Sequence, residues 1–229
     1  MSYTTAIDFT QIKVPSGIKT ILLDLDNTCY EYTPCHNAAL LQMQAAVEKI
    51  VGIVPDFLSL YQKAQQQVKN RIPKHASSHS RVLYAQTLFE LLGRTDGHIY
   101  APDLEKVYWD TFIKTMKKVA GLDDFLANCR KSGKTVIVVS DLTTTIQCQK
   151  LIALDIAKSI DFLVTAEEVG ADKPDSKPFL VALEKANGDI HTAVVIGDNY
   201  ERDIKGASSL GINSILITHG TQNQTTPLR

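Results

Sequence analysis

The segment Ile18–Thr28 reads IKTILLDLDNT and joins an apolar run to a row of polar side chains. Residues 21–23 form the run, and Asp24, Asp26 and Thr28 follow it at alternate positions. A continuous apolar run bounded by polar residues is typical of a strand buried on both faces, as in the middle of a parallel sheet. We therefore expect Asp24 and Asp26 at the carboxyl end of a central strand, where open α/β sheets place their chemistry.

Two carboxylates separated by one residue repel each other and are costly to remove from water, unless a cation lies nearby or one of them is protonated. Our hypothesis is that Asp24 is a phosphoryl-accepting nucleophile, that Asp26 is the acid and base beside it, and that Mg²⁺ holds the site together. The alternative is an acidic strand end that runs into a turn, because Asp, Asn and Thr favour turns. The rest of the chain decides between the two.

An all-helical insertion is predicted for residues 33–118. Apolar residues recur there at helical spacing, and no strand-like run interrupts them. The first expected helix extends to Val51, and the second follows Pro55-Asp56. The third runs from Ser77 or Ser78 to Gly93, and the fourth begins at Pro102. Residues 1–17 are expected to form a lead-in, and Cys29–Pro34 a flap outside regular structure.

Past Gly121 the pattern returns to strands that alternate with helices. The expected strands are 135–139, 162–164, 193–196 and 214–217, and the expected helices are 123–131, 143–154, 177–186 and 201–210. This alternation predicts βαβ units, hence an α/β fold with a Rossmann-like parallel sheet.

Polar residues follow three of the buried runs. Asp24 with Asp26, Ser140 and Asp198 occupy these positions, and the segment GDNYERD adds Asp203 five residues after Asp198. The ends of parallel strands share one edge of a sheet, so we expect these side chains to meet in one crevice. Mg²⁺ prefers such oxygen ligands. The alternative for Asp198 and Asp203 is that they cap the helix that follows.

A lysine and a serine complete this predicted site. Lys173-Pro174 follows AEEVGAD, and its loop-like setting favours Lys173 over Lys177 as a cation that faces the nucleophile. Ser140 offers a hydroxyl and a backbone N–H where a strand gives way to a helix, a geometry that binds anions. The alternatives are a solvated surface lysine and an ordinary turn serine.

Together, DLDNT, the strand that ends in Ser140, Lys173-Pro174 and Gly197-Asp198 with Asp203 resemble the four motifs of the haloacid dehalogenase-like hydrolase superfamily, in the same order. The resemblance covers about residues 18–32 and 119–218. The family carries a helical cap between its first two motifs. This implies a catalytic core of residues 1–32 and 119–229, with residues 33–118 as the cap.

The resemblance also implies roles for individual residues. Asp24 would form an aspartyl-phosphate, and Asp26 would protonate the leaving oxygen and then activate water. Asp24, the backbone carbonyl of Asp26 and Asp198 would hold Mg²⁺ with support from Asp203. The residues implied at the phosphate are Thr28, Ser140, Asp141 and Lys173. Asp141 is a departure, because many relatives carry asparagine there, and its role is left open.

The substrate implied is a small phosphomonoester: a nucleotide, phosphoglycolate or a sugar phosphate. Helical-cap relatives include phosphatases of the pyrimidine-nucleotide and phosphoglycolate types. Within the cap, the polar stretch RIPKHASSHSR makes His75, Ser77, His79 and Arg81 candidate substrate contacts. A sugar-phosphate mutase would keep the same core. A 2-haloacid dehalogenase would lack Asp26, and a non-catalytic binding protein would usually have lost a catalytic residue.

Composition sets wider limits. A net charge of -1 over 229 residues argues against binding to nucleic-acid polymers, and no apolar run of membrane-spanning length or secretory pattern is visible. The four cysteines lack C-x-x-C spacing, which favours reduced thiols in the cytoplasm. Residues 33–118 carry 11 Lys and Arg against 7 Asp and Glu, which suits an anionic substrate as well as it suits solvated helix faces. We expect a monomer or a weak homodimer.

Overall fold

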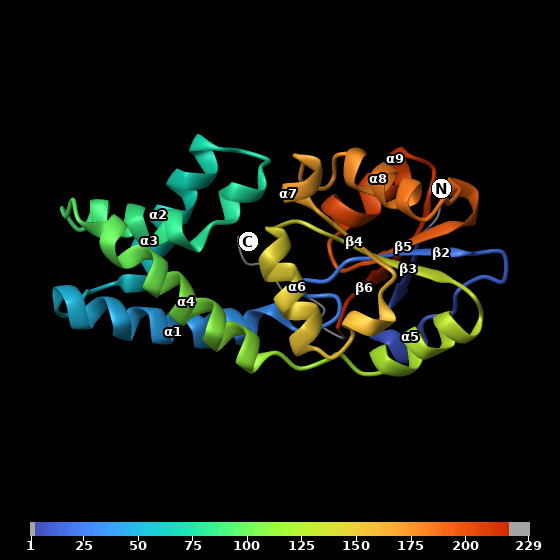
Figure 1. Ribbon diagram of the computed structural model, residues 1–229, viewed down its shortest axis with the longest axis horizontal. Coiled ribbons are helices and arrows are strands. Elements are labelled where there is room, and N and C mark those ends of the chain that lie inside the picture. The colour runs from blue at the N-terminus through green and yellow to red at the C-terminus, as the bar shows by residue number, and fades with distance from the viewer. Residues whose placement is uncertain (1–2, 220–229) are drawn as a thin grey trace. The chain divides into compact units, whose positions relative to one another are not determined.

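A computed structural model describes residues 3–219 (Figure 1). The chain separates into two compact units. The core unit comprises the described residues up to Glu31 together with those from Lys117 onward, and the helical unit is Tyr32–Met116. The boundaries expected from the sequence, after residues 32 and 118, lie within two residues of these.

The core unit contains a six-stranded, entirely parallel sheet in the order β1-β6-β5-β2-β3-β4. Its strands are β1 (Tyr3–Ala6), β2 (Thr20–Leu23), β3 (Thr135–Ser140), β4 (Phe162–Thr165), β5 (Ala193–Gly197) and β6 (Asn213–Ile217). Strand β2 is fully buried and lies between β5 and β3, with Leu23 opposite both Ile196 and Val138. The carboxyl ends of these three strands lie within two residues of one another in register, at the same edge of the sheet.

Helices cover both faces of this sheet. Helices α8 (Lys177–Lys185) and α9 (Lys205–Ser209) lie on one face, and α5 (Leu122–Lys131) and α6 (Thr144–Ala153) on the other (Figure 1). The short α7 (Ala166–Val169) and a π-helix over Tyr200–Ile204 complete the regular helices, with single 3-10 turns at Phe9–Gln11, Ala157–Ser159 and Ile190–Thr192. A buried apolar cluster between the sheet and α8 includes Leu22, Val195 and Phe179. The predicted α/β fold is confirmed.

The helical unit packs four helices against one another. They are α1 (Tyr32–Val51), α2 (Phe57–Arg71), α3 (Arg81–Leu91) and α4 (Gly97–Thr115), with a 3-10 turn at Ala76–His79 before α3. The prediction that α4 opens at Pro102 was wrong, because the helix begins five residues earlier and Pro102 lies inside it. Proline has a helical φ and removes a single N–H, a loss that a long helix packed against α1 and α3 can absorb.

Two further differences lie near the start of the chain. Strand β1 was not predicted, because only Ala6 of its residues is buried and an exposed edge strand carries no apolar run. The expected flap is shorter, since α1 already begins at Tyr32. The segments that lead into and out of the helical unit run beside each other within the core unit: Tyr30 bridges Lys118, and the N–H of Val119 donates to the carbonyl of Cys29 at 2.9 Å.

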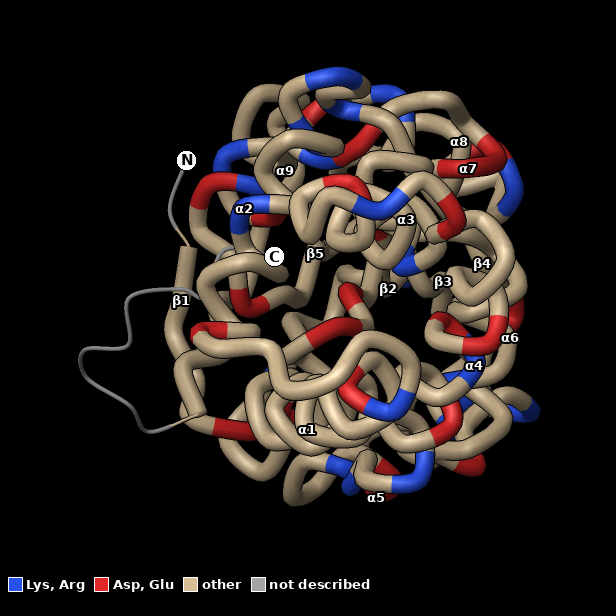
Figure 2. The backbone as a smooth tube through the Cα atoms, turned by 90° about the vertical axis from the view of Figure 1, so that its left-hand side faces the viewer, with Lys and Arg blue, Asp and Glu red and all other residues tan. Residues whose placement is uncertain are grey.

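Among the described residues, none of the helices is both long and apolar enough to cross a bilayer. Basic and acidic positions are interspersed along the backbone (Figure 2).

Candidate active site

Asp24 lies immediately after strand β2, and its carboxylate is buried among donors. Its backbone N–H donates to the carbonyl of Ile196 at 2.8 Å, which extends the sheet pairing by one residue. The Thr28 hydroxyl donates to Oδ2 of Asp24 at 2.7 Å, and Nζ of Lys173 donates to Oδ1 at 2.7 Å. Asn27 has a left-handed backbone (φ 65°) that turns the chain back, so Thr28 can reach the aspartate four residues before it.

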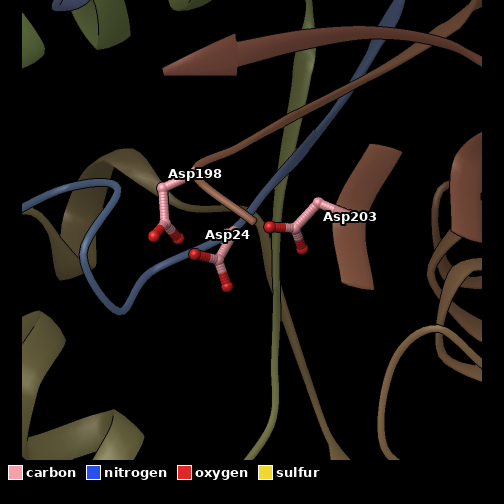
Figure 3. Close-up of side chains that lie close together, drawn as sticks. All are labelled: Asp24, Asp198 and Asp203. Carbon is pink, nitrogen blue, oxygen red and sulfur yellow. The ribbon is translucent and has the colours of Figure 1, made fainter. Parts of the chain in front are cut away.

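Three carboxylates meet at this edge of the sheet. Asp24, Asp198 and Asp203 each offer an oxygen, and these three atoms lie within 4.8 Å of one another (Figure 3). Asn27 donates its side-chain amide to Asp198 at 2.7 Å, and the backbone N–H of Asn199 donates to Asp203 at 3.0 Å. One side-chain amide and one backbone N–H thus hold two of the three carboxylates in place.

Lys173 is the cation of this cluster. Its Nζ is buried and lies 2.7 Å from Asp24 and 2.6 Å from Asp203. Burial opposes the charge of this ammonium, but Asp203, Asp24 and Asp141 outweigh burial and raise the pKa of Lys173 above its ordinary value. Lys173 is therefore a permanent positive charge in the site.

Three carboxylates against one lysine leave an excess of negative charge. Burial raises the pKa of Asp203 to about 7, with Lys173 opposing the shift and Asp24 and Asp198 adding to it. Such crowding favours a bound divalent cation, and a donor set made only of oxygens is the kind that Mg²⁺ selects. The residues present therefore fit Mg²⁺.

Gly197 explains how Asp203 comes so close to the end of β5. A Cβ atom at position 197 would lie 2.3 Å from Oδ2 of Asp203, far inside van der Waals contact. The strand can therefore end beside the buried carboxylate only where the side chain is hydrogen. The π-helix that holds Asp203 starts directly after Asn199, whose side chain accepts from the N–H of Arg202 at 3.0 Å.

Asp26 stands apart from the three clustered carboxylates and has its own donors. Nζ of Lys150 donates to its Oδ1 at 2.6 Å, the Tyr30 hydroxyl donates to the same atom, and the amide of Gln147 donates to Oδ2 at 3.2 Å. In this conformation the Asp26 side chain is not part of the group of oxygens that could hold a metal.

Ser140 is the last residue of strand β3, Asp141 follows it, and the two side chains have different partners. The Ser140 hydroxyl accepts from the amide of Gln147 at 2.5 Å. Asp141 accepts from the backbone N–H of Lys173 at 2.8 Å and from the guanidinium of Arg202 at 2.7 Å. The extra carboxylate is thus paired with an arginine, and it fixes the loop that presents Lys173.

Five side chains with hydrogen bonds in this site were not predicted from the sequence: Asn27, Tyr30, Gln147, Lys150 and Arg202. Gln147 and Lys150 lie three residues apart on one face of α6, and both are fully buried. The sequence does contain a signal for them, because two polar residues on the face of a helix that must pack against the sheet indicate a buried polar site. Arg202 gave no signal, because its partner Asp141 is 61 residues away.

The polar stretch of the helical unit divides between surface and interior. His75 is exposed and accepts from the N–H of Ser77 at 3.1 Å, and His79 is buried. Arg81 is buried, donates to the hydroxyls of Tyr32 and Tyr108 at 2.8 and 3.2 Å, and also donates to the carbonyl of His79 at 2.6 Å. Its guanidinium lies over the rings of Tyr84, Tyr108 and Trp109. Arg81 therefore organises the interior of the helical unit.

Comparison with known proteins agrees with this geometry. The chain is 32% identical over 211 residues to the ribulose-1,5-bisphosphate 5-phosphatase of Halopiger xanaduensis, covering 90% of this chain and 87% of that protein. It is 28% identical over 218 residues to the glyceraldehyde 3-phosphate phosphatase of Methanopyrus kandleri, covering 92% and 88%. Among solved structures, a 2-haloacid dehalogenase from Pseudomonas syringae shares the fold with a TM-score of 0.74 at 23% identity, over 92% of this chain and 91% of that one.

The sequence model of the haloacid dehalogenase-like hydrolases matches residues 18–211. That range begins at the strand that carries Asp24 and extends past Asp203. The predicted relationship is confirmed, and the chain belongs to the haloacid dehalogenase-like hydrolase family.

Proposed function

We propose that the protein is a Mg²⁺-dependent phosphatase that removes phosphate from a small sugar phosphate through an aspartyl-phosphate on Asp24. The observation that carries this proposal is the buried contact of Asp24 with Lys173 at the edge where Asp198 and Asp203 also meet. Two relatives that cover most of the chain are named as phosphatases of sugar phosphates, which supports this substrate class.

In the first half of the reaction, an oxygen of Asp24 attacks the phosphorus and the bond to the leaving oxygen breaks. Thr28 and Lys173 orient the attacking carboxylate through the hydrogen bonds described above. Asp26 gives its proton to the leaving oxygen, and Lys173 and Ser140 balance charge on the phosphoryl group.

In the second half, water attacks the phosphorus of the aspartyl-phosphate, and Asp26 takes the proton from that water. Phosphate leaves, Asp24 returns as a carboxylate, and Asp26 is protonated again, so the cycle is balanced in protons. Mg²⁺, held by Asp24, Asp198, Asp203 and the backbone carbonyl of Asp26, would supply positive charge to the phosphoryl group throughout.

We assign the helical unit the role of a cap that excludes bulk water and contacts the substrate. We propose His75 and His79 as substrate contacts in it, whereas the buried contacts of Arg81 with Tyr32 and Tyr108 assign that residue to the interior of the helical unit. We propose a reducing, cytoplasmic setting, which the absence of C-x-x-C spacing among the four cysteines of the sequence supports. We propose a monomer or a weak homodimer.

The proposal is tested by phosphate release from a panel that includes ribulose 1,5-bisphosphate, glyceraldehyde 3-phosphate, phosphoglycolate and nucleoside monophosphates. We expect release with Mg²⁺, loss with EDTA, and loss in Asp24→Asn. Release that persists in Asp24→Asn would contradict the nucleophile assignment. Formation of an isomeric sugar phosphate without free phosphate would select a mutase, and halide release from a 2-haloacid would select a dehalogenase.

A further inference from the structure

A second polar cluster, distinct from the three metal-facing carboxylates, surrounds the side chain of Asp26. It comprises Lys150 and Gln147 on α6 and Tyr30 after the first motif. All three donate hydrogen bonds to the oxygens of Asp26, so this arrangement suits the ionised form that Asp26 takes after it has given up its proton. Nζ of Lys150 also lies 5.8 Å from the centre of the Tyr30 ring.

The burial of Lys150 needs an explanation beyond folding. Its relative exposure is 0%, the same as that of the apolar residues at the centre of the sheet. Moving an ammonium out of water costs several kcal/mol, and a buried ion pair is often no more stabilising than apolar side chains of similar volume. Apolar side chains in place of both Lys150 and Asp26 would pack α6 against the sheet at no greater cost, so the pair is not needed for packing alone. The lysine therefore points to a role in the chemistry of Asp26.

Gln147 joins the Asp26 cluster to the phosphate-binding position. Its amide lies 2.5 Å from the Ser140 hydroxyl and 3.2 Å from Asp26, while its own Oε1 is buried without a hydrogen-bond partner. The spacing of three residues places Gln147 and Lys150 on one face of α6, one turn apart. A single helix thus sets the positions of Ser140 and Asp26 together.

We propose that Lys150, supported by Gln147, is a positioning residue for proton transfer: it holds the carboxylate that remains when Asp26 has given its proton to the leaving group. The inference rests on the proposed function. As the bond from phosphorus to the leaving oxygen breaks, the proton of Asp26 moves to that oxygen. The electron pair stays on Asp26, whose new negative charge then lies 2.6 Å from the Lys150 ammonium.

This role of Lys150 can be tested by comparing substrates whose leaving groups differ in their need for a proton. Nitrophenolate departs without a proton, whereas the alkoxide of a sugar phosphate needs one, and general acid catalysis contributes about 10²–10⁴-fold. In Lys150→Met we expect kcat/KM for the best sugar phosphate of the panel to fall about 100-fold, and kcat/KM for p-nitrophenyl phosphate to change less than about threefold. The ratio kcat/KM is chosen because it reports the steps up to departure of the leaving group. Equal losses for the two substrates would overturn the inference.

Matched variants separate a specific effect from a general one. Lys150→Arg keeps the charge and should recover part of the sugar-phosphate rate. Lys185→Met, which removes a partly exposed lysine paired with Glu168 in the same unit, should leave both substrates unchanged. If Lys150→Met does not fold, Lys150→Gln, which keeps a hydrogen-bond donor but removes the charge, takes its place, with the same selective loss expected and an equal loss counting against the inference.

Asp26→Asn distinguishes failure of the inference from failure of the proposed function. If Asp26→Asn keeps full sugar-phosphate turnover, Asp26 is not the acid and the proposed function itself is wrong. If Asp26→Asn is impaired, adding Lys150→Met should cause no further selective loss, because the lysine acts through Asp26. A further selective loss in the double variant would refute action through Asp26.

Discussion

At the scale of single residues, the site is a balance of charges in which each group restrains its neighbours. Lys173 holds two carboxylates that would otherwise repel each other, and Thr28 and Asn199 give each of them a further hydrogen bond. Removal of one member therefore affects the others as well as the chemistry.

Lys173→Met should destabilise the protein as well as inactivate it. The variant leaves Asp24 and Asp203 buried without their cation, a change that costs about 3–5 kcal/mol in buried ion pairs. Denaturant unfolding measures the loss. Asp203→Asn in the same background should restore part of it, and a fully additive double variant would show that the pair does not interact as described.

Gly197→Ala should abolish activity by a steric effect alone. The added methyl group would lie 2.3 Å from Oδ2 of Asp203, so the carboxylate must move away from Asp24 and Asp198. We expect kcat to fall at least about 100-fold, since small displacements of catalytic groups have effects of this size. Gly17→Ala is the control, because a Cβ there would meet nothing within 4 Å. Normal turnover in Gly197→Ala would show that Asp203 is dispensable.

At the scale of elements, the strand order brings distant segments together, and the loops then fix one another. Asp141 after β3 receives the backbone N–H of Lys173 from one loop and Arg202 from the π-helix after β5. The arginine neutralises a carboxylate that would otherwise repel a phosphate, and it braces the loop that presents Lys173.

Arg202→Met should weaken substrate binding. With Asp141 no longer paired, we expect KM for the phosphate substrate to rise about tenfold, which corresponds to about 1.4 kcal/mol. Lys205→Met is a suitable control, because that exposed lysine pairs with Glu201 in the neighbouring segment and faces no group of the site. An unchanged KM in Arg202→Met would mean that the Asp141 carboxylate does not repel the bound substrate.

The sequence predicted elements well where burial leaves a periodic signal. Five of the six strands and the longer helices between them were found, because apolar runs and 3.6-residue spacing are local properties. The four-residue α7 was not predicted, and the predicted helix 201–210 divides into a π-helix and α9. Strand β1, the true start of α4 and the partner of Asp141 were not found. They depend on an exposed sheet edge, on the packing of Gly97 against Phe89, and on a contact across 61 residues. The motif order predicted which side chains gather at the sheet edge, whereas the Lys150 contact with Asp26 needed coordinates.

At the scale of the whole molecule, the charged groups of the two units lie in different surroundings. The core unit concentrates charge at one sheet edge, while the helical unit holds the buried Arg81 and the half-buried His36 beside aromatic rings. The His36 ring lies 2.7 Å from the Tyr108 hydroxyl, and burial, reinforced by Arg81 and Lys69, lowers its pKa to about 3.

This shift predicts that acid destabilises the protein through His36. The unfolded chain takes up a proton near pH 6.5 and the folded chain does not, so the free energy of unfolding falls as the pH drops from 7 to 5, by up to about 2 kcal/mol. His36→Gln should remove this part of the pH dependence in denaturant titrations at both pH values. His191→Gln, at an exposed site, should retain it. An equal pH response in the wild type and His36→Gln would contradict the assignment.

The bridge between Tyr30 and Lys118 has a consequence for how such a molecule can diversify. Because the chain leaves the core unit and returns to it at neighbouring points, the segment between them closes a loop whose entropy depends only weakly on its length. The intervening module can be lengthened, recombined or exchanged while the chemistry at the strand tips stays intact. Such a connection allows the reaction to be conserved in evolution while the substrate specificity changes.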